Sequence, residues 1–225
     1  MRHWLVGNGK SLHDTPLHLL EGEISWGMNR IHTLFENTEW RPTHYFMCDH
    51  NQQNPRLYWH ECILENIDAK KWLWSAFRDG IPANMANGTA EPGLGDLPNT
   101  TWIERCKKHH HYSAGNPKSM QEWHLPELCT GLGGMSTMLQ LAVLEGATEI
   151  YLVGCDLYTW TGDYNDNFFD PDYTSDPRDR TEIDNAHMTQ LHEVASRCAG
   201  IPVYNAGIGG KLEVYPRVDI YEVLK

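Results

Sequence analysis

The sequence predicts a single α/β domain, residues 1–225, with a mainly parallel central sheet flanked by helices. Three observations support this class. The first fifty residues alternate strand-length apolar runs with a segment of helical spacing. The two most apolar runs, at residues 3–6 and 149–153, each end in glycine, as strands often do where a loop begins. A length of 225 residues, 40% of them hydrophobic, suits one domain and would be cramped for two.

Each element is predicted from its period and its boundaries. Strands are predicted where short apolar runs are bounded by turn-forming residues, at residues 3–6, 23–26, 43–47, 71–76, 101–105, 149–153 and 202–205. Helices are predicted where apolar residues recur every three to four positions, at residues 29–35, 57–67, 135–144 and 187–199. The third of these helices is apolar nearly all round, which predicts that it is buried.

Two long segments interrupt this alternation. Residues 78–100 are rich in glycine and proline, which resist regular structure, so a functional or mobile loop is expected there. Residues 159–184 are acidic with interspersed aromatic side chains, and we expect them to form a lid over a ligand.

Composition excludes some classes of protein. The 18 Lys+Arg and 30 Asp+Glu give a net charge of −12, which disfavours nucleic acid as the main partner but admits a small charged substrate. No apolar run reaches the ~18 residues of a membrane span, and the first residues lack a signal-peptide core, so a cytoplasmic protein is expected. The 6 cysteines include no CxxC pair and no zinc-ligand spacing appears, so reduced thiols and no metal site are expected.

The two glycine turns form the first candidate binding feature. Ligands of open α/β sheets bind beyond the carboxyl ends of the strands, so the turns at residues 7–9 and at Gly154 should border one cleft. Backbone N–H groups of residues 7–9 can point outward toward a phosphate or diphosphate. Neither the dinucleotide-binding fingerprint nor the P-loop motif is present, and simple turn glycines are the alternative.

Four segments in matching order carry a resemblance that covers most of the chain: residues 5–12 (LVGNGKSL), 27–29 (GMN), 129–131 (CTG) and 149–158 (EIYLVGCDLY). They resemble the bacterial lipooligosaccharide sialyltransferase family, and the same motifs mark proteins called pterin diphosphokinase-like. The resemblance implies a Rossmann-like, glycosyltransferase A-like domain. It also implies transfer of sialic acid from CMP-sialic acid with inversion, without a metal for the chemistry.

The resemblance further implies a donor pocket. Asn8 and Asn29 match asparagines that line the family's pocket, and amides suit ribose and sugar hydroxyls. Thr130 and Gly131 match small residues before the buried helix, where a nucleotide or its phosphate can bind; an ordinary helix cap is the alternative. Two acidic residues at the sheet edge can contact ribose or an acceptor. The predicted binding residues are Gly7, Asn8, Gly9, Lys10, Ser11, Asn29, Asp49, Thr130, Gly131, Gly154 and Asp156.

Three residues match the family's catalytic groups. Tyr158 and Tyr164, six residues apart, match tyrosines whose hydroxyls bond the leaving phosphate, with packed aromatics as the alternative. His187 matches the family's general base, a histidine ahead of the helix that leads to the last strand. A neutral imidazole at this position can take a proton from an acceptor hydroxyl. His192 is the competitor, although five helical steps place it on a different face.

Two departures from the family pattern bear on the substrate. Lys10 stands where the family usually has proline, and an ammonium beside a phosphate loop suits a donor with more phosphate; a solvated lysine is the alternative. Glu127 stands where an arginine is usual, which removes a positive charge suited to sialic acid.

These features predict a sialyltransferase-like glycosyltransferase that moves a sugar from a nucleotide-activated donor, a CMP-sugar first of all, to a small or glycan acceptor. No cofactor is expected to be required, although Mg²⁺ can accompany a diphosphate or triphosphate donor. One alternative is a pterin diphosphokinase-like enzyme that uses ATP and Mg²⁺. Another is a non-catalytic nucleotide-binding protein. The sequence is also compatible with a homo-oligomer.

Overall fold

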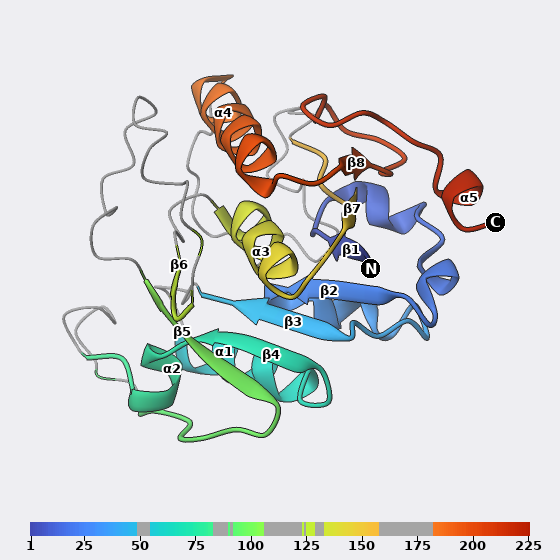
Figure 1. Cartoon of the computed structure of the whole chain (residues 1–225). Coiled ribbons are helices and arrows are strands. Elements are labelled where there is room, and N and C mark those ends of the chain that lie inside the picture. The colour runs from blue at the N-terminus through green and yellow to red at the C-terminus, as the bar shows by residue number, and fades with distance from the viewer. Residues whose placement is uncertain are drawn as a thin grey trace.

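The chain folds around one eight-stranded sheet in which every pair of neighbouring strands is parallel (Figure 1). The computed structural model describes residues 1–48, 55–82, 90, 92–105, 123, 125–128, 133–157 and 182–225, with the side chains at 55–59, 105 and 182–187 outside the description. The strands are β1 (Arg2–Val6), β2 (Ile24–Met28), β3 (His44–Met47), β4 (Lys70–Trp74), β5 (Thr100–Arg105), β6 (Glu127–Leu128), β7 (Glu149–Val153) and β8 (Val203–Asn205).

Helices fill most of the described connections between strands. The α-helices are α1 (Pro55–Glu65), α2 (Ala76–Asp79), α3 (Gly133–Leu144), α4 (Glu182–Ala199) and α5 (Ile220–Val223). Three short 3₁₀-helices are η1 (Lys10–His13), η2 (Leu17–Leu20) and η3 (Asn29–Leu34). The predicted α/β class with a parallel sheet and flanking helices is confirmed.

Several predicted boundaries are wrong. The segment expected as a helix at 29–35 is the 3₁₀-helix η3, because Asn29 has a φ of 49° and Arg30 a ψ of 25°, which interrupt regular helix. The strand expected at 71–76 ends at Trp74, and α2 begins at Ala76, the last residue of that expected strand, and ends at Asp79, the second residue of the segment expected as a loop. Helix α4 begins at Glu182, inside the expected lid, rather than at His187.

The order of strands reverses direction once. The sheet runs β6-β5-β4-β3-β2-β1-β7-β8, so the chain builds outward from β1 to β6 and then returns through α3 to place β7 on the other side of β1. Trp4 of β1 lies opposite Ser25 of β2 on one side and Tyr151 of β7 on the other. The point between β1 and β7 is therefore the topological switch point, where open α/β sheets bind their ligands.

The two faces of the sheet are covered by different helices. Right-handed crossovers place α1 and η3 on one face, and the reversed direction of travel places α3 and α4 on the other. In Figure 1, α3 and α4 lie side by side, and α1 lies behind β4. Large aromatic side chains fill the core on both faces; Trp4, Trp26, Trp72 and Tyr45 are among the largest fully buried ones.

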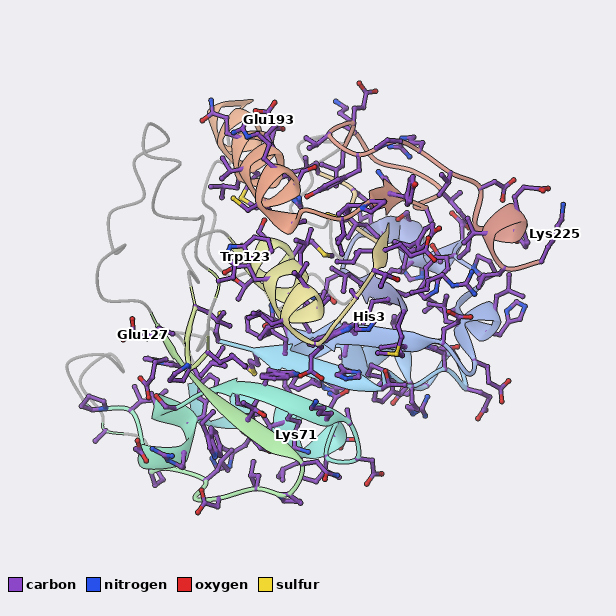
Figure 2. All side chains as sticks on the ribbon, in the orientation of Figure 1. His3, Lys71, Trp123, Glu127, Glu193 and Lys225 are labelled. Atoms are coloured by element: carbon purple, nitrogen blue, oxygen red, sulfur yellow. The ribbon has the colours of Figure 1, made fainter. Side chains whose placement is uncertain are left out.

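A row of rings crosses the face beneath α3. Trp26 stacks on His44 with centroids 4.4 Å apart and on Trp72 at 6.3 Å, and its Nε1 donates to Nδ1 of His3 at 3.2 Å. Figure 2 shows His3 at the sheet. Burial lowers the pKa of His3 and that of His44 to about 4, so both imidazoles are neutral at pH 7.

Candidate functional site

The two predicted glycine turns meet at the switch point. The N–H of Gly7 donates to the carbonyl oxygen of Val153 at 2.8 Å, and the N–H of Gly9 donates to that of Gly154 at 2.8 Å. A Cβ on Gly7 would lie 2.3 Å from the Gly154 oxygen, closer than any side chain allows. Glycine is therefore required for the close approach of the two turns, as the sequence predicted for one shared edge.

These contacts correct one expectation about phosphate binding. The amides of Gly7 and Gly9 were expected to point outward, but both are used to bond the first turn to the end of β7. They cannot serve a phosphate without breaking these bonds. Glycines at both positions are explained by packing, and the remaining predicted contacts of this turn with a ligand stay a prediction.

Asp156 ties the first turn to the loop after β7. Its Oδ2 accepts a hydrogen bond from the N–H of Ser11 at 2.9 Å, and its Oδ1 accepts one from the Ser11 hydroxyl. A Cβ on Gly9 would lie 2.3 Å from Oδ2 of the same carboxylate. The two hydrogen bonds between Ser11 and Asp156 position Lys10 and η1 at the site. Direct contact of Lys10, Ser11 or Asp156 with a ligand stays a prediction.

A third glycine-rich loop, residues 207–211, reaches the same edge from the end of β8. The N–H of Lys211 donates to the carbonyl oxygen of Asp156 at 2.6 Å, and a Cβ on Gly209 would lie 3.6 Å from Cβ of Ser11. This loop is not among the predicted site residues. Its signal was present, because three glycines follow the last predicted strand just as glycines follow residues 3–6 and 149–153.

Gly210 is the position of this loop where a side chain should cost most. A Cβ there would lie 2.4 Å from both Cα and the carbonyl oxygen of Asp156, and its φ is +81°. We expect Gly210→Ala to lower the free energy of unfolding by about 2–4 kcal/mol, measured by urea denaturation.

Gly22 and Gly209 provide matched controls for this variant. Gly22 has the same φ of +81° with nothing within 4 Å of its Cβ position, so Gly22→Ala measures the backbone strain alone. Gly209 has ordinary contact distances, so Gly209→Ala should change stability by less than about 1 kcal/mol. Equal losses for Gly210→Ala and Gly22→Ala would contradict the close packing on Asp156.

The two predicted asparagines occupy adjacent strand ends. Asn8 follows β1, and its Nδ2 lies 3.5 Å from the carbonyl oxygen of Met28, the last residue of β2. Asn29 follows Met28, and its own carbonyl oxygen accepts a hydrogen bond from the hydroxyl of Tyr45 at 2.8 Å. The buried Oδ1 of Asn8 has no hydrogen-bond partner in the described part of the chain, which leaves an acceptor for a ligand.

A buried polar chain lies behind the end of β7. Nε2 of His192 lies 3.8 Å from Sγ of Cys155, and Nδ1 lies 3.1 Å from the hydroxyl oxygen of Tyr215. The Tyr215 hydroxyl also donates to the carbonyl oxygen of His192 at 3.2 Å. One assignment satisfies all three groups: the Cys155 thiol donates to Nε2, Nδ1–H donates to Tyr215, and Tyr215 donates to the carbonyl.

Burial keeps these three hydrogen-bonded side chains uncharged. It lowers the pKa of His192 to about 4 and raises the pKa of the Cys155 thiol to about 12. His192 is 1% exposed, whereas the next residue, Glu193, is exposed on the outer side of α4 (Figure 2). His192 therefore packs α4 against Tyr215 and against Cys155, in the loop after β7.

Several predicted site residues lie outside the described residues. These are Asp49, Thr130, Gly131, Tyr158 and Tyr164. The backbone of His187 lies in α4, but its side chain is outside the description, as are residues 159–181 of the expected lid. The structure thus brings together Gly7, Asn8, Gly9, Lys10, Ser11, Asn29, Gly154 and Asp156 at the ends of β1, β2 and β7.

Within the described ranges, no three or more His, Cys, Asp or Glu side chains are grouped to hold a metal ion. No described helix is long and apolar enough to cross a membrane. The four cysteines described, Cys48, Cys62, Cys155 and Cys198, are free thiols.

Comparison with known proteins supports the fold. No protein-family model matches the chain, and no curated protein matches it in sequence. The structure of the MAf glycosyltransferase from Magnetospirillum magneticum AMB-1 aligns with 97% of this chain at 12% identity and a TM-score of 0.56. The sialyltransferase CstII from Campylobacter jejuni, in complex with cytidine-5'-monophosphate, aligns with 96% of this chain and 84% of its own at 14% identity and a TM-score of 0.50.

The chain spans 33% of the length of that MAf glycosyltransferase. At identities of 12% and 14%, the likeness shows a shared α/β fold and does not show a shared activity.

Proposed function

We propose that this chain is a glycosyltransferase that moves a sugar from a nucleotide-activated donor, a CMP-sugar in the first instance, to an acceptor hydroxyl with inversion. The observation that carries the proposal is the junction of β1 and β7, where two glycine turns and Asn8 meet at the switch point of a parallel sheet. Two solved glycosyltransferases share the α/β fold of this chain, and one of them is in complex with CMP.

The proposed chemistry assigns one role to each catalytic candidate. His187 takes the proton of the acceptor hydroxyl as its oxygen attacks the anomeric carbon. The bond between that carbon and the phosphate oxygen breaks, and the phosphate leaves with the electron pair. Tyr158 and Tyr164 donate hydrogen bonds to the leaving phosphate, so no metal is required to stabilise the developing charge.

A donor screen tests this function. CMP, UDP, GDP and ATP, each with and without Mg²⁺, are added to the protein and the melting temperature is measured, because a ligand stabilises the state that binds it. Selective stabilisation by CMP, followed by release of CMP from a CMP-sugar in the presence of acceptors, is the expected result. A strict requirement for ATP and Mg²⁺ would indicate the diphosphokinase-like alternative, and stabilisation without turnover would indicate a binding protein.

The tyrosine pair gives a sharper prediction. We expect Tyr158→Phe and Tyr164→Phe each to lower kcat on the order of 10²-fold while changing donor affinity little, because the hydroxyl acts on charge that develops in the transition state. Steady-state kinetics with the confirmed donor measure both constants.

Tyr221→Phe is the control for these variants, since Tyr221 is 54% exposed on α5. It should retain the wild-type kcat. Wild-type kcat in both Tyr158→Phe and Tyr164→Phe would reassign the pair to packing.

A further inference from the structure

The peptide groups of the 207–211 loop have a common orientation. The guanidinium of Arg217 donates to the carbonyl oxygens of Gly207 at 3.1 Å, Gly209 at 3.1 Å and Gly210 at 2.7 Å. In a trans peptide, the carbonyl and the following N–H point in opposite directions. The N–H groups of the residues that follow these glycines, namely Ile208, Gly210 and Lys211, therefore point away from Arg217.

One of these three N–H groups shows what lies on that side. The N–H of Lys211 donates to the carbonyl oxygen of Asp156, in the loop after β7. The other two, on Ile208 and Gly210, have no acceptor among the residues that the structure describes. These two N–H groups, two residues apart, project from the same side of the loop, and backbone N–H groups that share a direction can together bind an anion.

The loop is held rigidly enough to keep this arrangement. The side chain of Asn205, which is 1% exposed, accepts from the N–H of Gly207 at 2.9 Å and donates to the carbonyl oxygen of Leu212 at 2.8 Å. Arg217 closes the opposite side. A binding loop whose donors are fixed before the ligand arrives loses less entropy on binding.

Two lysines add positive charge at the same edge. Lys211 ends the loop, and Lys10 adjoins Ser11, whose Cβ lies 3.6 Å from the Cβ position of Gly209. Both lysines are exposed, and neither forms an ion pair within the described residues. The carboxylate of Asp156, which is also at this edge, accepts hydrogen bonds from the N–H and the hydroxyl of Ser11. Although the net charge of the chain is −12, the two lysines make this edge locally positive, so it can attract an anion.

We infer that the 207–211 loop and Lys10 form an anion site that takes a phosphate group of a nucleotide bound at the switch point. The N–H groups of Ile208 and Gly210 donate to the phosphate, and the ammonium groups of Lys10 and Lys211 neutralise it. The choice of a nucleotide rests on the proposed function, whereas the anion site itself does not require sugar transfer.

The test compares a phosphate-bearing ligand with its phosphate-free analogue. Affinities for CMP and for cytidine are measured by titration calorimetry on the wild type and on two variants, Lys10→Met and Lys211→Met. Each substitution removes the positive charge and keeps a side chain of similar length. Each substitution should weaken CMP binding about tenfold and leave cytidine binding unchanged. Lys211→Arg should retain most of the affinity, and Lys225→Met, at the chain end and paired with Glu222, is the control (Figure 2).

A residue-specific readout accompanies the affinities. In amide NMR spectra, the resonances of Ile208 and Gly210 should move when CMP or pyrophosphate is added and stay in place with cytidine. Binding of CMP with neither amide moving and no effect of either lysine substitution would overturn the site and leave the proposed function standing. Lysine-dependent shifts with pyrophosphate, but no transfer from any nucleotide sugar, would support the site and contradict the proposed function.

Discussion

The protein should lose stability as the pH falls from about 6.5 to about 4. Burial lowers the pKa of His3, His44 and His192 to about 4 in the folded chain, whereas an unperturbed histidine has a pKa of about 6.5. Between these values the unfolded state binds more protons than the folded state, so the free energy of unfolding decreases on acidification. Each group contributes at most roughly 3 kcal/mol, and above about pH 7 their contribution is complete.

The hydrogen bonds of His3 and His192 also predict that the free energy of unfolding decreases on acidification. Nδ1 of His3 accepts from Trp26 and would have to give up that bond to carry a proton, and Nε2 of His192 accepts from the Cys155 thiol in the assignment above. Protonation therefore breaks a buried hydrogen bond and leaves a charge in the core.

Urea denaturation at several pH values between 7.5 and 4 measures this loss. His3→Gln and His192→Gln should each be less stable than the wild type at neutral pH but lose less further stability on acidification. His18→Gln, at an exposed position, is the control. A pH dependence that is the same in the wild type and in both buried-site variants would mean that carboxylates, and not these histidines, cause the acid sensitivity.

The sheet could be predicted from local patterns, but its order could not. Apolar runs such as residues 149–153 identify a buried strand by themselves, and the structure places β7 at those same residues. The position of β7 beside β1 depends on pairing between residues 147 positions apart, such as Arg2 and Glu149, which no local period encodes. Strand β6 has two residues, Glu127 and Leu128, too few to show any alternation.

Part of the candidate site could likewise be predicted from local sequence, and part of it depends on the strand order. Gly7 and Gly154 stood out because glycine directly after an apolar strand signals a tight turn. Their mutual contact, and the consequent use of the Gly7 and Gly9 amides, appear only when β1 and β7 are neighbours. The chain of Cys155, His192 and Tyr215 joins three distant segments, and no spacing in the sequence relates them.

His187→Ala should lower kcat on the order of 10²–10⁴-fold with little change in donor affinity, because a general base acts on the acceptor proton. His187 lies in α4 five residues before His192, which an ideal helix places about 140° away around the axis. His192 is committed to Cys155 and Tyr215, and with a pKa of about 4 it is a weak base for an acceptor hydroxyl. The structure thus removes the main competitor for the role, while the role of His187 itself remains a prediction.

Variants at the two histidines separate a base from a packing residue. His192→Ala removes a buried ring and should lower the free energy of unfolding, whereas His187→Ala should leave stability nearly unchanged and abolish the limb of the pH–rate profile that reports the base. Tyr215→Phe removes one hydroxyl from the His192 chain without touching the ring and is the matched control for indirect effects. The opposite result would be a His192→Ala variant that has wild-type stability but no transfer activity, together with a fully active His187→Ala variant. It would mean that His192 is the base and that α4 must move during the reaction to expose this buried ring to the acceptor.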